Sequence, residues 1–345
     1  MESDKEVTIY DIARKLNISP ATVSRGLQDH PSISKKTKKR IFDFADQIGY
    51  RSNHFARNLR AQKTDTIGVI IPRLNSHFMS SVIAGMEHIT NDQGYTLIIS
   101  QSSESATKEA ASAKTMFKSR VDGLLVSLAY DTAELHHFDS FFKKTTPVIF
   151  FDRVMEHQHC TSILIDNRKA AYEATKHLIQ QGCKRIAHIT AQSQQNVYVD
   201  RFKGYKQALA EHKLKFKEDD IVYTNLSQEA GAEAAQILLK MKPRPDGIFV
   251  ANDSCAVGCM SALKAKGVRI PEDIAFVGFN NDPVSTVIEP NLTTINYSGY
   301  EMGQVAARHL INHLNGTSPI DNTNTIILRS DLVIRQSSLK KGATN

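Results

Sequence analysis

Residues 8 to 27 read TIYDIARKLNISPATVSRGL, a pattern typical of two short helices joined by a tight turn. Thr8 is expected to cap the first helix, with its hydroxyl accepting from the amide three residues on, and Asp11 at that third position completes a capping-box-like pair. Apolar residues then recur at three- and four-residue spacing, which predicts one buried stripe. Asn17 is the predicted turn residue, because asparagine tolerates left-handed backbone geometry.

A second helix is predicted to restart at Ser19-Pro20, because serine caps a helix and proline is tolerated at its first position. Val23 and Leu27 would face inward. The outer face would be small, polar and rich in hydroxyl groups, which suits insertion into a DNA major groove, and its residues are Ala21, Thr22, Ser24 and Arg25. An arginine there can donate two hydrogen bonds to guanine. The alternative is an ordinary helical hairpin with a solvated face.

The run VTIYDIARKLNISPATVSR, at residues 7 to 25, closely resembles the N-terminal headpiece of LacI/GalR-type bacterial transcriptional repressors. The resemblance continues, in order, through IGY at 48–50, ARNL at 56–59, TIGVIIP at 66–72, PEDIAFVGF at 271–279 and LTTI at 292–295. It therefore covers nearly the whole chain, and the motifs together are highly specific. The resemblance implies a helix-turn-helix domain, a hinge helix and a core of the periplasmic-binding-protein type.

The positive charge of the chain is concentrated at its N-terminal end. Residues 1–63 hold 13 Lys and Arg against 7 Asp and Glu, whereas the whole chain has a net charge of +7. This distribution indicates a nucleic-acid-binding module joined to a nearly neutral body. A disordered basic tail is the other interpretation, and the helical patterning of the segment argues against it.

The 345 residues are 41% hydrophobic and 23% charged, which is typical of a globular protein with two or three domains. No apolar run is long enough for a transmembrane helix, and the polar N-terminus lacks the apolar segment of a secretory signal, so we expect a cytoplasmic protein. Cys255 and Cys259 are expected to pack in the core. The cluster at 157–160, His-Gln-His-Cys, is interpreted as a surface loop and not as a metal site.

Ser34 is expected to cap a third helix that ends at Gly49 in a left-handed conformation. Its first turns hold a basic run that is placed to touch phosphates: Lys35, Lys36, Lys38, Lys39 and Arg40. The three helices are predicted to share one small core, formed by Ile12, Leu16, Val23, Leu27, Ile41, Ala45 and Ile48.

Residues 51–63 are interpreted as a linker with a short helix in its middle, capped by Asn53. The resemblance implies the family's hinge helix, in which Leu59 would wedge between base pairs of the minor groove. A plain interdomain linker is the alternative. Ser52 departs from the proline usual in the family, which predicts a looser hinge before DNA binds. The residues that we assign to DNA binding are Thr8, Tyr10, Ser19, Ala21, Thr22, Ser24, Arg25, Asn53, Ala56, Arg57 and Leu59.

From Thr66 onward, apolar strand-like runs alternate with helical stretches, which predicts a doubly wound α/β body, with two sheets and a cleft between them. Strands are expected at 66–72, 95–100, 121–127, 147–152, 162–166, 185–190, 221–224, 247–251 and 274–279. The fold class is thus α/β, with a small N-terminal helix-turn-helix domain plus hinge helix joined to a two-lobed core. The expected domains are a headpiece at 1–51, a hinge at 52–64, and a core at 65–340 with lobes at about 65–162 plus 295–327 and about 163–294 plus 328–340.

Ligands in such folds bind at the carboxyl ends of strands, so polar residues that directly follow apolar runs are candidate ligand contacts. The resemblance assigns effector-binding positions to Phe78, Asp152, Arg201, Asn252 and Asn280. Each could instead cap a helix or join a salt bridge between lobes. The aspartate usual in the family is replaced by Asn280, which removes a strong acceptor. We therefore expect either a ligand that differs from the common free sugars or one that is held mainly by Asp152 and Arg201.

The prediction is a transcriptional regulator, most simply a repressor, that binds a palindromic double-stranded DNA operator as a homodimer. Its small-molecule effector would be a sugar or sugar phosphate, with a purine as second choice; a protein corepressor is also compatible with the family. No cofactor is expected, and the sequence lacks the G-x-G-x-x-G, P-loop and G-x-S-x-G motifs, so catalysis is not expected. The chain after Arg335 holds no leucine heptads, which favours a dimer without a tetramerisation helix. The rival interpretation is a cytoplasmic solute sensor without specific DNA binding.

Overall fold

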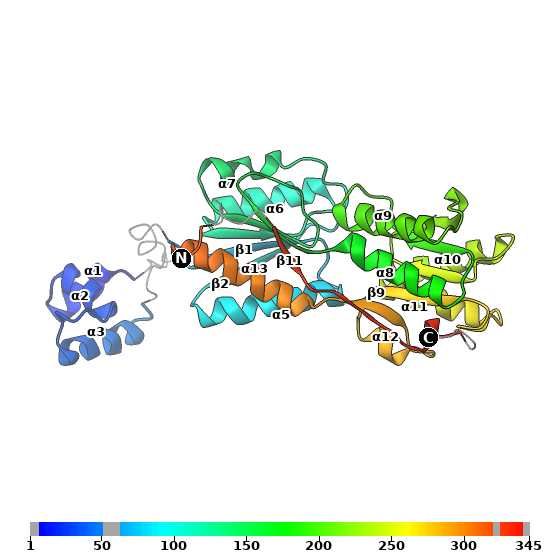
Figure 1. The fold of residues 1–345 in the computed structure, drawn as a ribbon. Coiled ribbons are helices and arrows are strands. Elements are labelled where there is room, and N and C mark those ends of the chain that lie inside the picture. The colour runs from blue at the N-terminus through cyan, green and yellow to red at the C-terminus, as the bar shows by residue number, and fades with distance from the viewer. Residues whose placement is uncertain (1–6, 51–62, 320–324, 341–345) are drawn as a thin grey trace, which may run out of the picture. The chain divides into compact units, whose positions relative to one another are not determined.

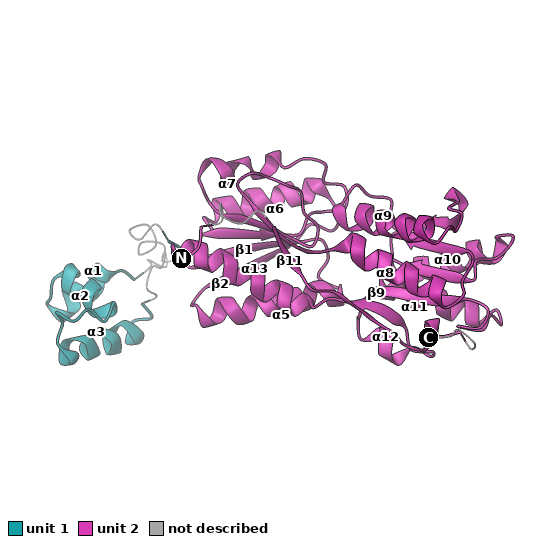
Figure 2. Ribbon diagram, viewed as in Figure 1, with its two compact units in different colours: residues 1–64 teal, residues 65–345 magenta. Residues whose placement is uncertain are grey.

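The computed structural model describes residues 7–50, 63–319 and 325–340. The chain forms two compact units, residues 1–64 and residues 65–345 (Figure 2). We call the described part of the first unit, residues 7–50, the headpiece, and the described part of the second, from residue 65 on, the core. No helix in the described ranges is both long and apolar enough to cross a membrane.

Three helices make up the headpiece: α1 (Ile9–Leu16), α2 (Pro20–Leu27) and α3 (Lys35–Gln47). The turn after α1 is left-handed at Asn17, with φ of 53°, as the sequence predicts. The small apolar core contains all seven predicted residues, and Ile12, Val23 and Ile41 are its fully buried members. Gly26 allows α2 to approach α3 closely, since a Cβ there would lie 2.4 Å from Cδ1 of Ile41.

The core contains two six-stranded sheets (Figure 1). The first has the order β11-β5-β4-β3-β1-β2 and the second β12-β10-β9-β8-β6-β7. All neighbouring strands are parallel except β10 and β12, which are antiparallel. The strands are β1 (Thr66–Ile71), β2 (Thr96–Gln101), β3 (Gly123–Val126), β4 (Val148–Phe151), β5 (Thr161–Ile165), β6 (Ile186–Thr190), β7 (Ile221–Tyr223), β8 (Gly247–Val250), β9 (Ala275–Asn280), β10 (Thr293–Asn296), β11 (Thr325–Leu328) and β12 (Asp331–Val333).

Helices cover both faces of each sheet, which is why the central strands are apolar on both sides. In the first lobe α5 and α13 pack on one face and α6 and α7 on the other; in the second, α8 and α9 oppose α10 and α11. The helices are α5 (His77–Asp92), α6 (Ala106–Lys118), α7 (Asp139–Lys143), α8 (Asn167–Gln180), α9 (Asn196–Glu211), α10 (Gln228–Lys240), α11 (Asp253–Lys264), α12 (Val284–Val287) and α13 (Gly299–Leu314).

All nine predicted strands are present, and β10, β11 and β12 are the strands of the described core that the sequence did not predict. The missed strands are three or four residues long, and β10 reads Thr-Thr-Ile-Asn, without a continuous apolar run. Gly94, Gly182 and Gly267 have positive φ directly after α5, α8 and α11, where helix ends were expected. Cys255 and Cys259 are buried, as predicted.

The chain passes between the two lobes three times (Figure 1). The passages follow β5, separate β10 from α13, and separate β11 from β12. Because parallel strands of both sheets end near these passages, the loops after the strands of one lobe meet those of the other.

Candidate functional site

The outward face of the headpiece carries the side chains predicted to contact DNA. Tyr10 is 64% exposed, and Ala21 and Arg25 of α2 also face solvent. Ser19 caps α2 by accepting from the amide of Thr22 at 3.0 Å, and the hydroxyls of these two residues lie 2.8 Å apart. Ser24 is half-buried. The face is thus small and polar around one projecting arginine.

The capping box expected at the start of α1 is present, and Thr8 and Asp11 are its members. The hydroxyl of Thr8 also lies 2.7 Å from the Asp11 carboxylate, to which it donates. The Thr8 amide donates to the same carboxylate at 2.9 Å, and the amide of Asp11 donates to the Thr8 carbonyl at 3.0 Å. An ionised carboxylate is a stronger acceptor than a hydroxyl, so it takes both Thr8 donors.

The basic run at the start of α3 is divided between two roles. Lys35, Lys36, Lys39 and Arg40 are exposed, as a phosphate-contacting surface requires. Lys38 turns inward, and its Nζ lies 2.6 Å from the Asp29 carboxylate and 2.8 Å from the Asp29 carbonyl. This hydrogen bond and the charge of Lys38 lower the pKa of Asp29. Lys38 therefore stabilises the turn between α2 and α3. The four hinge candidates, Asn53, Ala56, Arg57 and Leu59, lie outside the described residues.

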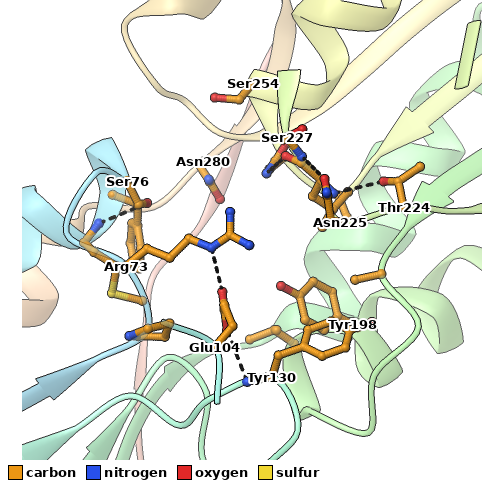
Figure 3. Close-up of a pocket in the computed structure, with 18 of the residues that line it drawn as sticks. Arg73, Ser76, Glu104, Tyr130, Tyr198, Thr224, Asn225, Ser227, Ser254 and Asn280 are labelled. Atoms are coloured by element: carbon orange, nitrogen blue, oxygen red, sulfur yellow. Dashed lines mark hydrogen bonds and ion pairs between the residues drawn. The ribbon is translucent and has the colours of Figure 1, made fainter. Parts of the chain in front are cut away.

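The core contains a cavity of about 730 Å³ between its two lobes, which we call the cleft (Figure 3). All five residues predicted to bind the effector line it: Phe78, Asp152, Arg201, Asn252 and Asn280. They come from the start of α5, the end of β4, the first half of α9, the start of α11 and the end of β9. The volume lies in the upper half of the 300–1,000 Å³ range typical of small-molecule sites.

Asp152 and Arg201 are the buried charges of the cleft. Asp152 directly follows β4 with φ of 58° and is 8% exposed. Burial raises the pKa of its carboxyl, and the charges of Arg153 and Arg201 oppose that rise. The guanidinium of Arg201 donates to Asn167 Oδ1 at 2.9 Å and to the Ala251 carbonyl at 2.7 Å. These bonds fix the arginine fork in one orientation.

The guanidinium of Arg201 also lies over the ring of Phe279, 3.6 Å from its centroid, which holds the charge against an aromatic face. Phe78 packs on Tyr297 with ring centroids 4.7 Å apart. Asn280 lines the cleft (Figure 3). Its Oδ1 accepts from the Tyr297 hydroxyl at 3.3 Å. The floor of the cleft therefore combines aromatic rings with polar groups, and contacts between these side chains fix their positions.

Asn252 also caps a helix, which is the alternative role that its sequence position allowed. Its Oδ1 accepts from the Cys255 amide at 2.8 Å, which caps α11, and its Nδ2 donates to the Leu226 carbonyl at 2.9 Å. Because both ends of the amide have protein partners, Asn252 shapes the cleft wall more than it offers free hydrogen-bonding groups.

An ion-pair network in the cleft was missed by the sequence analysis. Glu104 accepts from Arg153 Nη1 at 2.6 Å. The same carboxylate lies 3.3 Å from Arg73 Nε (Figure 3). Arg153 also donates to the Tyr198 hydroxyl at 2.9 Å. Arg73 and Glu104 follow β1 and β2 closely, so the rule used for Asp152 would have found them had it been applied to every strand.

Residues 193–196 and the first lobe form a set of hydrogen bonds that we call the clasp. Gln195 Nε2 donates to the carbonyls of Ala129 and Thr132, both at 2.9 Å. Ser193 donates to the Tyr130 carbonyl at 2.9 Å, and Asn196 to the Asp152 carbonyl at 3.1 Å. The clasp joins the loop after β6 to the loops after β3 and β4 at the edge of the cleft.

Two protein families match parts of the chain. Residues 8–53 match "Bacterial regulatory proteins, lacI family", and residues 175–338 match "Periplasmic binding protein-like domain". Catabolite control protein A of Priestia megaterium is 33% identical over 310 residues, which cover 90% of this chain and 93% of that protein. The chain belongs to the LacI family.

Other relatives of this LacI-family chain agree with the assignment. The HTH-type transcriptional repressor PurR of Vibrio atlanticus is 30% identical and covers 96% of the chain and 98% of its own length. A LacI family transcriptional regulator from Enterococcus faecium, solved with bound ribose, superposes with a TM-score of 0.71 at 25% identity, over 79% of this chain and 98% of that one. The protein is thus a DNA-binding transcriptional regulator with a periplasmic-binding-protein-like core, and its relatives are regulators and not enzymes.

Proposed function

We propose that the protein is a dimeric repressor that binds a palindromic operator and is controlled by a small molecule in the cleft. The headpiece, taken as residues 1–51, would read the operator, the segment 52–64 would act as the hinge, and the core, taken as residues 65–340, would bind the effector. The observation that carries the proposal is the convergence of five predicted ligand contacts on one polar cavity between two lobes, in a chain whose headpiece belongs to a DNA-binding family.

The cleft favours a carbohydrate or sugar phosphate as effector. Carboxylates, amides and hydroxyls line it, and these groups pair with the hydroxyls of a sugar. The Enterococcus faecium relative was solved with ribose, which supports this ligand class. A purine is the second candidate, since Phe78 and Tyr297 offer aromatic rings for stacking. A ligand that contacts both lobes would change the angle between them and so the affinity for DNA.

A second copy of the chain is the proposed occupant of an apolar edge on the first lobe. Strand β2 lies at the edge of its sheet, and Ile98 and Ile99 are 39% and 40% exposed. Tyr300 on α13 is also 39% exposed. An edge strand with exposed isoleucines is an aggregation hazard unless a partner covers it. Two-fold pairing there would present two headpieces to the two halves of a palindrome.

Selection from a pool of random duplex DNA at near-physiological salt tests the DNA-binding part of this proposal. We expect one palindrome to be enriched, and we expect Arg25→Ala and Leu59→Ala to lose it, because the first removes a base contact and the second the minor-groove wedge. Arg329→Ala, which removes an exposed arginine of the core, is the matched control and should retain the site. Sequence-blind binding that disappears with salt would contradict operator recognition and favour the solute-sensor interpretation.

A further inference from the structure

Residues 129–132, which we call the acceptor loop, supply three of the four first-lobe carbonyls of the clasp. The carbonyls of residues 129 and 132 accept from Gln195, and that of residue 130 accepts from Ser193. These neighbouring carbonyls can serve the other lobe only if the backbone is fixed, because rotation of a planar peptide group turns its carbonyl away. The groups that fix this backbone belong to the first lobe.

Glu109 of α6 is the first of these groups. It is fully buried, and its carboxylate accepts from the Ala129 amide at 2.6 Å and from the Thr132 hydroxyl at 2.9 Å. His137 Nε2 lies 2.8 Å from the same carboxylate. Burial of a carboxylate is costly, and replacing a buried ionic group by an apolar one often leaves a protein equally stable. Stability alone therefore gives little reason for a carboxylate at this position, whereas the need to fix one loop does.

Glu104 holds the next peptide group of the acceptor loop. Its carboxylate accepts from the Tyr130 amide at 3.1 Å (Figure 3). The Tyr130 amide and the Ala129 carbonyl belong to one planar peptide group and point in opposite directions. A chain of hydrogen bonds therefore runs from Glu104 through this peptide group to the side chain of Gln195 in the second lobe. Because the bonds of such a chain polarise one another, the negative charge of Glu104 makes the carbonyl a stronger acceptor.

Asp131 ties the acceptor loop to the beginning of α6. Its carboxylate accepts at 2.6 Å from the amide of Ala106, the first residue of that helix. The N-terminus of a helix carries a partial positive charge, which favours a carboxylate there. The acceptor loop is therefore held to one end of α6 at three places, by the carboxylates of residues 104, 109 and 131.

Gln195 is committed to the acceptor loop from the second lobe. It occupies the N-cap position of α9, but its side chain does not cap that helix. Its Nε2 donates instead to two carbonyls of the first lobe, and the residue is 3% exposed. Glutamine is not among the residues that N-cap positions favour, so this side chain serves the contact between lobes and not its own helix.

We propose that Glu104 and Glu109 are positioning residues for the contact between the two lobes. They hold the acceptor loop in the backbone conformation to which Gln195 and Ser193 donate, so the second lobe docks on a preformed surface. Glu104 also belongs to the ion-pair network of the cleft, so the charges that line the ligand site and the bonds that join the lobes meet at one carboxylate. The inference goes beyond the proposed function, because it does not depend on which effector or operator the protein binds.

Hydrogen–deuterium exchange of the full-length protein, measured by mass spectrometry at residues 193–199 of the second lobe, tests the proposal. Glu109→Gln keeps the size of the side chain but replaces one acceptor oxygen with a donor group. We expect the amides of 193–199 to exchange roughly fivefold faster, the factor that corresponds to about one lost hydrogen bond. Glu134→Gln, which removes an exposed carboxylate between β3 and α7, is the control and should match the wild type. Faster exchange at residues 129–132 with unchanged exchange at 193–199 would show that Glu109 only stabilises its own lobe, and would overturn the proposal.

Glu104→Gln is the second variant, because Glu104 lines the cleft and its replacement should leave the lobe folded even if the change at the buried Glu109 does not. We expect it to raise exchange at residues 193–199 in the same direction as Glu109→Gln. A folded Glu104→Gln protein with wild-type exchange in this segment would contradict the proposal.

A double-mutant cycle with Gln195→Ala shows whether the carboxylates act through the acceptor loop. Gln195→Ala removes two hydrogen bonds, so alone it should raise exchange at residues 193–199 by more than either glutamate variant. If the glutamates position the carbonyls for Gln195, adding Glu104→Gln or Glu109→Gln to Gln195→Ala should raise exchange little further. Effects that multiply would show that the glutamates and Gln195 act independently, and the assignment of positioning residues would then be wrong.

Discussion

The described headpiece residues proposed to read DNA lie between Thr8 and Arg25, whereas the cleft is lined by residues as far apart in the chain as Pro72 and Tyr297. In the headpiece, helical periodicity alone decides which side chains share a face. In the core, neighbours are decided by the order of strands in two sheets and by three passages between lobes. DNA recognition is thus specified locally, and ligand recognition is specified by topology.

This difference predicts how each site responds to mutation. A small domain with one short core depends on each of its few buried residues, so damage anywhere in the headpiece should abolish its function. The cleft draws on many elements of a large core, so single changes there should lower affinity without unfolding the lobes. Four experiments test this contrast.

Ile41→Ala is expected to have the largest effect. Ile41 is fully buried in α3, and truncating such a residue costs between about 2 and 5 kcal/mol, close to the whole stability of so small a domain. We expect loss of operator binding in an anisotropy assay, with saccharide binding in the cleft retained. Phe42→Ala, on the same helix and 43% exposed, is the control. Equal losses for the two variants would show that burial does not decide the effect.

Acid is expected to weaken the core through His188. Burial lowers the pKa of this imidazole to about 4, and its ring stacks on Phe249 with centroids 4.6 Å apart. Between pH 6.5 and pH 4, His188 is protonated in the unfolded chain but stays neutral in the folded chain. The free energy of unfolding therefore falls as the pH falls, by about 3 kcal/mol in total. Thermal unfolding of the wild type and of His188→Phe across this pH range measures the fall in stability. The stability of the variant should depend less on pH. An equal pH dependence in the two proteins would show that His188 is not the cause.

Asp152→Asn is expected to lower saccharide affinity by about tenfold to a hundredfold, because it replaces a charged acceptor with a neutral one. Asparagine also tolerates the positive φ at this position, so the fold should persist. Calorimetry measures the affinity, and ligand-free operator binding should match the wild type. Asp139→Asn on α7, outside the cleft, is the control. Loss of operator binding in Asp152→Asn alone would show that the two sites are not separable.

The smallest expected effect comes from a matched pair of glycines. Gly49 and Gly267 both have positive φ after a helix, and a Cβ at either would meet nothing within 4 Å. Alanine should therefore cost each unit only the left-handed strain, about 1 kcal/mol. In thermal unfolding, Gly49→Ala should lose more helical signal than Gly267→Ala, because the headpiece is the less stable of the two units. Gly49→Asn should recover part of the signal that Gly49→Ala loses. Equal responses would weaken the contrast between the two regions.

The sequence predicted local features better than those set by tertiary contacts. Asn17, Ser19 and Gly49 have the expected conformations because their roles depend on immediate neighbours. The inward turn of Lys38 was missed, since it depends on Asp29 nine residues away, at the other end of a turn. Strand β10 was missed because it contains buried threonines in place of apolar residues. Hydrogen bonds to distant residues satisfy their hydroxyls, as in the bond from Thr294 to Asp253.

The same distinction holds in the cleft. Five predicted residues line it because their positions follow from strand ends and from the family resemblance. The bond between Glu104 and Arg153 joins residues 49 positions apart, and no local pattern indicates it. Tyr198 lies inside α9, where a rule about strand ends does not reach. Tyr297 directly follows β10, a strand that was not predicted, so the rule was not applied there.

The clasp has a consequence for how the ligand site can evolve. On the first-lobe side its acceptors are main-chain carbonyls, at residues 129, 130, 132 and 152. Every amino acid carries such a carbonyl, so a substitution at Tyr130 removes the bond from its hydroxyl to the Gln192 carbonyl but leaves the acceptor for Ser193 in place. Descendants of this chain can therefore exchange one ligand for another by point mutation while the two lobes stay joined.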